Sequence, residues 1–331
     1  MTKERDTSID VACGIMIIWM IFYHSMQFSG MIGTVFFETS TQIFFFFMAW
    51  FFYKGGIFAK TQPFVRTVLG GANRLLKPFA VFSAFGLIVY WIELLACNDF
   101  LLNSGLIIPL KSFFAYGAVQ GNLPLWFLWS LFLVRIYYCC GIKWRWFPEL
   151  LFMLLIVFYF IKFLDLFELG HCLLKPLYLY NSFVGLIFFY CGYRLKCLQY
   201  NKRVILLSIA ILMAILFFAP ARFDIHNVTV VERQKGDFLL FIISATSACV
   251  LLNALCRYIC GKCDFGILSY IGENSLSLFC IHWILLVIVR DLIVCHLDIG
   301  EGWPKMVVYC LSLLLLLPLC LTLMKRLNIN Y

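Results

Sequence analysis

The chain has 331 residues, of which 63% are hydrophobic and 13% are charged. Soluble domains are usually about 45–50% apolar and about 25% charged, so this composition excludes an ordinary soluble enzyme and indicates a protein largely embedded in lipid. The formal net charge of +9 does not indicate nucleic-acid binding, because the basic residues fall in short loops between apolar segments rather than on a folded basic face.

Ten segments are apolar and long enough to be candidates for membrane-spanning helices. They are 9–29, 38–58, 78–97, 123–141, 147–165, 176–195, 203–220, 237–259, 268–293 and 305–325. Their apolar runs are continuous, which favours helices over the alternating pattern of a membrane β-barrel. We therefore expect an all-α polytopic membrane helical bundle of about ten transmembrane helices, forming a single domain over residues 1–331. The first segment lacks a small-residue cleavage site, so we expect it to remain in the protein.

The Lys and Arg residues are distributed unevenly between the two sets of loops. When the loops are assigned alternately to the two sides of a membrane, the side that holds both termini carries the larger share of the 26 basic residues. Basic loops tend to stay in the cytoplasm, so we expect both termini to be cytoplasmic, which requires an even number of spans.

One cytoplasmic connection, 54–77, is rich in basic residues and contains no acidic residue. Its basic residues are Lys54, Lys60, Arg66, Arg74 and Lys77. Lys and Arg bind phosphate groups through charge and hydrogen bonds, so these side chains are candidates for binding acyl-CoA or another phosphate-rich ligand. The alternative is that they only set the membrane topology or contact anionic lipid headgroups.

The 15 cysteines lie mostly inside apolar segments, where a free thiol behaves as a small buried hydrophobe. They show no repeated zinc-ligand spacing, so we expect neither a disulfide framework nor a metal centre. Cys260 and Cys263 form a single CxxC in a basic loop, and a zinc role for them is the minor alternative.

Ionisable residues inside the predicted spans are the strongest candidates for a site, because burying them in a membrane is costly. His24 lies fourteen residues after Asp10, about 21 Å further along a helix. Counting from the predicted helix starts places Glu93 and His282 at about the same depth, and Trp126 enters from the other side near that level. We expect a cavity in the outer half of the membrane to be surrounded by His24, Glu93, His282 and Trp126. The alternative for His24 is a histidine satisfied by a neighbour within the bundle.

These residue types suit acid–base chemistry. His24 titrates near neutrality and can take a proton from a hydroxyl group, while His282 or Glu93 orients the imidazole or stabilises its charged form. A zinc site of two His and one Glu is the weaker alternative, because its ligands lie on three separate helices with no short-range pair.

Five short motifs occur in order along the chain. They are the run 8–14 followed by His24 and Ser25, the aromatic run 44–56, the RLLKPF run 74–79, the LWFL run 125–128, and the IGENSL run 271–276 followed by His282. Each motif is weak alone, but the ordered set resembles the acyltransferase-3 family of integral membrane O-acyltransferases, in the branch of fucose 4-O-acetylase-like bacterial sugar acetyltransferases. Ten spans also match that family.

The resemblance implies an acyltransferase that moves an acyl group, most often acetyl, from cytoplasmic acyl-CoA to a hydroxyl of a cell-surface or exported glycan. Acetyl-CoA would be a substrate bound by the connection 54–77, with no bound cofactor, and the acceptor would be a polysaccharide or a lipid-linked sugar of the cell envelope. The protein would be a multi-pass protein of the bacterial cytoplasmic membrane. Asp10, Asn274 and Ser275 would then take part in substrate binding, with Trp126 as a wall for a sugar ring and His24 in catalysis.

One position departs from the family pattern. The family has Arg eleven residues before its first-helix His, and this chain has Cys13 there. Either another cation, Arg74 or Lys77, substitutes for it, or the protein does not perform the usual transfer. The second outcome favours an alternative function, transport or export of a glycan or a lipid-linked intermediate. A purely structural membrane protein would leave the buried His and Glu residues unexplained.

Overall fold

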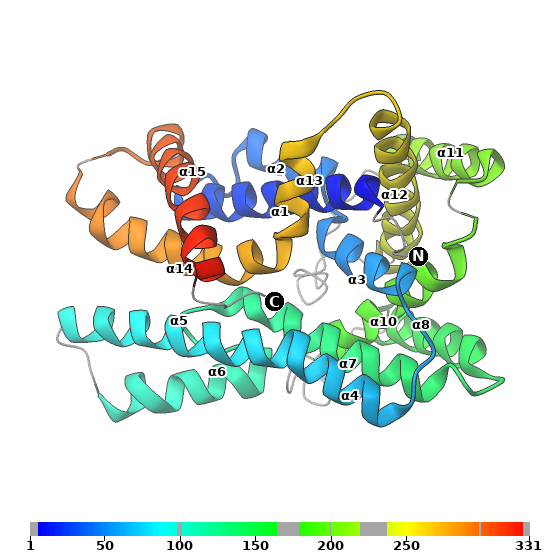
Figure 1. Cartoon of the computed structure of the whole chain (residues 1–331), viewed down its shortest axis with the longest axis horizontal. Coiled ribbons are helices and arrows are strands. Elements are labelled where there is room, and N and C mark those ends of the chain that lie inside the picture. Colours follow the sequence, from blue (N-terminus) through cyan, green and yellow to red (C-terminus); the bar gives the residue numbers. More distant parts are fainter. Residues whose placement is uncertain are drawn as a thin grey trace.

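The computed structural model describes residues 6–97, 101–163, 179–198, 200–218, 237–297 and 299–326. Its elements are helices, and the described residues contain no strand (Figure 1). The all-α fold predicted from composition is therefore confirmed.

The helices are joined by short loops and, in places, by 3₁₀ or π-helical segments (η). In chain order they are α1 (Thr7–Phe28), α2 (Val35–Ile43), α3 (Phe47–Ile57), α4 (Phe64–Gly71), η1 (Ala72–Leu76), α5 (Lys77–Ala96), η2 (Asn103–Ile107), α6 (Ile108–Tyr116), η3 (Leu123–Leu125), α7 (Trp126–Gly141), α8 (Phe147–Phe163), α10 (Leu179–Leu195), α11 (Lys202–Phe218), α12 (Asp237–Cys260), α13 (Gly266–Glu273), α14 (Ser275–Leu292), η7 (Val294–His296) and α15 (Trp303–Arg326).

Six helical segments within the described residues are long and apolar enough to cross a membrane. They are Thr7–Phe28, Phe64–Ala96, Leu123–Gly141, Leu239–Cys260, Ser275–His296 and Trp303–Arg326. The polytopic helical bundle is thus confirmed, while the count of ten spans and the side of the termini stay predictions. Parts of the predicted spans 147–165, 176–195 and 203–220 lie outside the described residues.

Helix α1 is the central element of the fold. Most of its residues are buried, as expected for a helix that is apolar on all sides, and it contacts α3, α12, α13, α14 and α15. Its closest approach is to α13, where Gly14 lies against the backbone of Leu268 and Gly272 lies against the backbone of Asp10. No side chain fits between the two backbones, so these glycines fix the point at which α13 crosses α1.

Two predicted spans are interrupted. The segment 38–58 divides into α2 and α3, and Ser40 and Thr41 at the end of α2 donate their hydroxyl groups to carbonyl oxygens of the preceding turn, a contact that often bends helices. The segment 268–293 divides at Asn274, whose side-chain nitrogen donates to the carbonyl oxygen of Tyr270 at 2.7 Å. These polar side chains satisfy backbone groups that a continuous helix would otherwise pair.

The basic connection 54–77 is mostly helical rather than a loop. Helix α3 continues to Ile57, and α4 begins at Phe64 directly after Pro63. Figure 1 shows α4 and α5 following one another across the lower half of the view, and the residues Phe64–Ala96 form one apolar helical segment. Only residues 58–63 connect two helices, so most of the predicted basic residues project from helices.

The connection 98–122 also contains helical structure that the sequence did not reveal. Helix α6 runs beside α5 in Figure 1, and the indole nitrogen of Trp91 donates to the carbonyl oxygen of Gly105 at 2.7 Å. These residues place η2 and α6 against the second half of α5.

Candidate active site

The rings of His24 and His282 lie against each other inside the bundle. Their centroids are 5.3 Å apart, and their planes differ by 27°. His282 is fully buried and His24 is 4% exposed, so both imidazoles are enclosed by protein. The structure therefore brings together two of the residues that the sequence marked as candidates for acid–base chemistry.

Hydrogen bonds at Nδ1 orient both imidazoles. Nδ1 of His282 lies 2.7 Å from the carbonyl oxygen of Phe279, and because a carbonyl only accepts, this nitrogen carries the proton. Nε2 of His282 is then an acceptor, and it has no hydrogen-bond partner among the described residues. Nδ1 of His24 lies 2.7 Å from Oε1 of Gln27, whose side-chain nitrogen donates to the hydroxyl of Tyr23. With Gln27 as the acceptor, His24 also presents Nε2 as its basic nitrogen.

The two histidines lie together although the helix that carries His282 begins later than the sequence predicted. The count assumed a continuous helix through 268–293, whereas α14 begins anew at Ser275. His282 is therefore seven residues into its own helix rather than fourteen residues into a longer one. The crossing of α13 over α1 leaves α14 beside α1, which explains why the two rings meet despite the interruption.

Aromatic side chains enclose the histidine pair. Trp283 meets His24 edge-on, with ring centroids 5.1 Å apart. Phe279 lies 5.9 Å from His282 by the same measure. This enclosure limits the access of water to the basic nitrogens, which strengthens electrostatic interactions within the site.

The beginning of α7 adds a further wall. The side-chain nitrogen of Asn122 donates to the carbonyl oxygen of Cys280 at 2.9 Å, and Phe127 packs against Phe279 with ring centroids 5.4 Å apart. Trp126 lies between these two contacts in the chain and is 3% exposed. The residue predicted to stack on a sugar is thus a buried part of the wall near the histidine pair, and its stacking role stays a prediction.

A second polar cluster lies in the first half of α1. Asp10 is 6% exposed, and Cys13 is fully buried. The side chain of Lys54, from α3, lies close enough to the Cys13 thiol for its charge to act on it, and the Asp10 charge acts on the same thiol. A cation therefore adjoins the position of the missing arginine, but it comes from Lys54 rather than from the predicted Arg74 or Lys77.

Two arginines converge where α7 packs against α4 and η1. Gly71 lies against the ring of Phe132, and Arg74 and Arg135 are each three residues further along their own helices. Helical side chains lean toward the helix N-terminus, so both arginines lean back toward this contact. Arg74 is close enough to act electrostatically on Arg135, and no carboxylate of the described residues pairs with either one.

The other basic residues predicted to bind a donor lie on the surface. Lys60 follows α3, Arg66 lies on α4, and Lys77 begins α5; all three are exposed. Their role in donor binding stays a prediction.

Asn274 and Ser275 form the junction between α13 and α14. Asn274 follows the last residue of α13 and bonds to the carbonyl of Tyr270, while Ser275 is buried and is the first residue of α14. The two side chains thus help to end one helix and begin the next. Their predicted part in substrate binding is not tested by these contacts.

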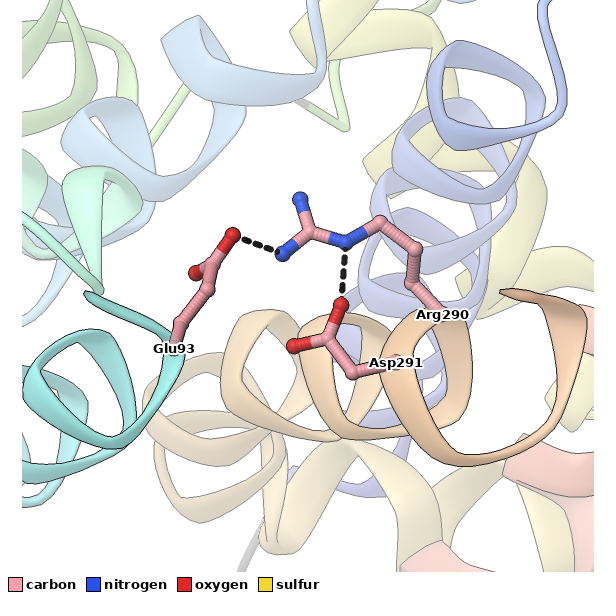
Figure 2. A network of polar contacts seen from close by, with 3 residues as sticks. All are labelled: Glu93, Arg290 and Asp291. Carbon is pink, nitrogen blue, oxygen red and sulfur yellow. Dashed lines mark hydrogen bonds and ion pairs between the residues drawn. The ribbon is translucent and has the colours of Figure 1, made fainter. Parts of the chain in front are cut away.

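Glu93 belongs to a charged group near the ends of α5 and α14 (Figure 2). Nη2 of Arg290 lies 2.7 Å from Oε1 of Glu93, and Nε of Arg290 lies 2.7 Å from Oδ1 of Asp291. The three side chains are 34–37% exposed. Arg290 lies eight residues beyond His282 on α14, about 12 Å along the helix. The structure therefore places Glu93 in a group of its own beside the outermost turns of α14.

Several residues of these clusters escaped the sequence analysis. Gln27 lies three residues after His24, a spacing at which helical side chains meet. Arg290 lies inside the predicted span 268–293, so the cost of placing a charge there was a usable signal. Among the described residues, no group of three or more His, Cys, Asp or Glu side chains is placed to hold a metal ion.

A family model described as an acyltransferase domain, that of the acyltransferase-3 family, matches residues 6–325. The chain therefore belongs to this family, and its apolar helices make it a multi-pass membrane protein. The predicted family is confirmed, while the bacterial, fucose-acetylase-like branch stays a prediction. No curated protein and no solved structure matches the chain.

Proposed function

We propose that this membrane acyltransferase moves an acetyl group from cytoplasmic acetyl-CoA to a hydroxyl group of a cell-surface or exported glycan in a bacterial inner membrane. The observation that carries the proposal is the buried contact of His24 with His282 in a chain of an acyltransferase family. Two adjoining imidazoles with protonated Nδ1 and basic Nε2 atoms are suited to transferring a proton from a hydroxyl group.

In the proposed reaction His24 acts as the general base. Its Nε2 takes the proton of the acceptor hydroxyl while the hydroxyl oxygen attacks the thioester carbonyl carbon; the carbon–sulfur bond then breaks, and the imidazolium returns the proton to the departing thiolate. The products are the glycan ester and free CoA. His282 stabilises the positive charge that forms on His24, and Gln27 holds His24 in the required tautomer.

The donor is proposed to enter past Arg74 and Arg135. Two converging cations without a carboxylate partner among the described residues favour an anionic ligand, and guanidinium groups bind phosphate through paired hydrogen bonds. Lys54 adds a third positive charge beside Cys13. These contacts support a donor that carries several phosphate groups, as acetyl-CoA does.

The test is mass spectrometry of surface glycans from cells carrying the wild-type protein, a gene deletion, His24→Ala or His296→Ala. His296 is an exposed histidine in η7, so its substitution is a matched control. We expect the acyl mass increment to disappear in the deletion and to fall at least about 100-fold in His24→Ala, because general-base catalysis contributes about 10²–10⁴-fold. His296→Ala should match the wild type.

Two outcomes would contradict the proposal in different ways. If the glycan carries no acyl group in any strain and its surface amount collapses on deletion, the protein is a transporter or exporter. If deletion removes the acyl group and His24→Ala retains it, the transfer reaction stands and the general base lies elsewhere.

A further inference from the structure

We propose that Glu93, Arg290 and Asp291 form a binding site for a neutral, hydroxyl-rich part of the acceptor glycan, beyond the sugar that receives the acyl group. The inference rests on the proposed function for the identity of the acceptor. It gives Glu93 a role in acceptor binding in place of the proton transfer expected from its predicted depth.

Glu93, Arg290 and Asp291 have hydrogen-bond donors and acceptors that their two ion pairs do not use. Arg290 uses Nη2 and Nε for its two carboxylate partners (Figure 2), and its other terminal nitrogen, Nη1, takes no part in these ion pairs. Each carboxylate likewise contributes one oxygen to the ion pairs, Oε1 of Glu93 and Oδ1 of Asp291. Open donors and acceptors held side by side suit the paired hydroxyl groups of a sugar, which both donate and accept hydrogen bonds.

The charge of the group selects against anionic ligands. One guanidinium between two carboxylates leaves an excess of one negative charge when all three are ionised. A phosphate or carboxylate ligand would be repelled by the two acidic side chains. A neutral polyhydroxylated ligand meets no such electrostatic repulsion.

Aromatic side chains connect the charged group to the histidine pair. Trp283 touches His24 and lies seven residues before Arg290, so the two project from the same face of α14. Phe28 meets Trp283 edge-on at 5.0 Å and Tyr309 at 5.9 Å, and Tyr309 lies close enough to feel the charge of Arg290. Aromatic surface with a few placed polar groups is the usual lining of a ligand site.

Stability alone does not account for the charged group. Partly exposed ion pairs contribute only about 0–1 kcal/mol to stability. A group with little structural benefit, open polar atoms and an aromatic path to the catalytic histidines is better explained by a ligand.

The experiment measures binding of surface polysaccharide, purified from the deletion strain and fluorescently labelled, to the full chain in lipid nanodiscs without any donor. We expect Arg290→Gln and Asp291→Asn to weaken binding about tenfold or more, because each loses a hydrogen bond to a charged group. The double variant Glu93→Arg/Arg290→Glu restores an ion pair but rearranges the open donors and acceptors, and we expect its binding to stay weak.

The pair Glu301–Lys305 supplies the matched control. Glu301 precedes α15 and Lys305 lies in its first turn, with Nζ and Oε1 3.7 Å apart. The double variant Glu301→Gln/Lys305→Gln should bind as the wild type does. Recovery of binding in the charge-exchanged variant, or wild-type binding in Arg290→Gln, would overturn the inference. The binding assay contains no donor, so its result does not depend on acyl transfer. If the acetyl-transfer proposal fails, the wild type will bind the glycan in this assay but will not acylate it in a separate assay with acetyl-CoA.

Discussion

Two groups of charged side chains in the described part of the chain differ in their balance of charge. At the packing of α7 against α4 and η1, Arg74 and Arg135 converge, and no described carboxylate pairs with them. Near the ends of α5 and α14, Arg290 lies between Glu93 and Asp291. The first group carries two positive charges, and the second carries an excess of one negative charge.

This difference in charge balance indicates which ligand each group accepts. Unpaired cations favour phosphates, whereas an internally paired group with open polar atoms favours hydroxyl groups. The two groups thus suit the two substrates of the proposed transfer reaction, in which the buried histidine pair is the proposed catalytic centre. The comparison is informative because both groups use arginine, so the residue type alone does not distinguish them.

The largest effect outside the histidine pair is expected at Arg135. Arg135→Gln should raise the acetyl-CoA concentration for half-maximal rate by about tenfold to 100-fold, because a hydrogen bond between charged groups contributes about 1.5–3 kcal/mol. The measurement is the initial rate of CoA release in proteoliposomes of neutral lipid, which excludes anionic headgroups as the ligand. Lys143→Gln, an exposed cation just beyond α7, should leave this concentration unchanged.

A truncated donor distinguishes phosphate binding from a packing defect at Arg135. Acetyl-pantetheine lacks the phosphate groups, so Arg135→Gln and the wild type should use it equally well. If the variant loses activity equally with acetyl-pantetheine and acetyl-CoA, Arg135 supports the fold and does not bind the donor.

How far the sequence predicts this molecule depends on whether a feature is local. The bounds of α1, α7, α12 and α15 follow within a few residues from uninterrupted apolar length, which is a property of each segment by itself. The interruption at Asn274 was missed because the surrounding run is apolar enough to resemble one span. Helix α6 was missed because its segment was treated as a connection.

The candidate site was only partly predictable for a different reason. His24 and His282 stood out because ionisable side chains in apolar helices are costly. The partners Lys54 to Cys13, Arg135 to Arg74 and Arg290 to Glu93 come from different helices, and no spacing in one sequence reports which helices are neighbours. Tertiary packing alone decided that Lys54 lies beside Cys13.

A smaller effect on the acyl-transfer rate is expected at Lys54. Moving its positive charge from α3 to α1 tests whether the charge itself is what the site requires. Lys54→Ala should lower the acyl-transfer rate about tenfold, the loss of roughly one charge-assisted contact. In the double variant Lys54→Ala/Cys13→Arg, the cation returns on α1, and we expect most of the rate to recover. The measurement is acetyl incorporation into glycan, with Lys143→Ala, an exposed lysine just beyond α7, as the control. A wild-type rate in Lys54→Ala would show that the cation beside Cys13 is dispensable.

The smallest effect on ligand binding is expected at the crossing of α1 and α13. A Cβ at Gly14 would collide with the carbonyl oxygen of Leu268, whereas a Cβ at Gly70 in α4 meets no atom within 4 Å. Gly14→Ala should therefore destabilise the protein by about 1–3 kcal/mol through overpacking, and Gly70→Ala should be neutral or stabilising by about 0.5–1 kcal/mol. Thermal unfolding of the purified variants in detergent measures both effects.

Gly14 contacts neither charged group, so its substitution should leave the half-saturating concentrations of donor and acceptor near their wild-type values. The maximal transfer rate should fall, because the substitution shifts α1 against α14. A change in only one of those concentrations would mean that the crossing belongs to the corresponding ligand site rather than to the support of the histidine pair.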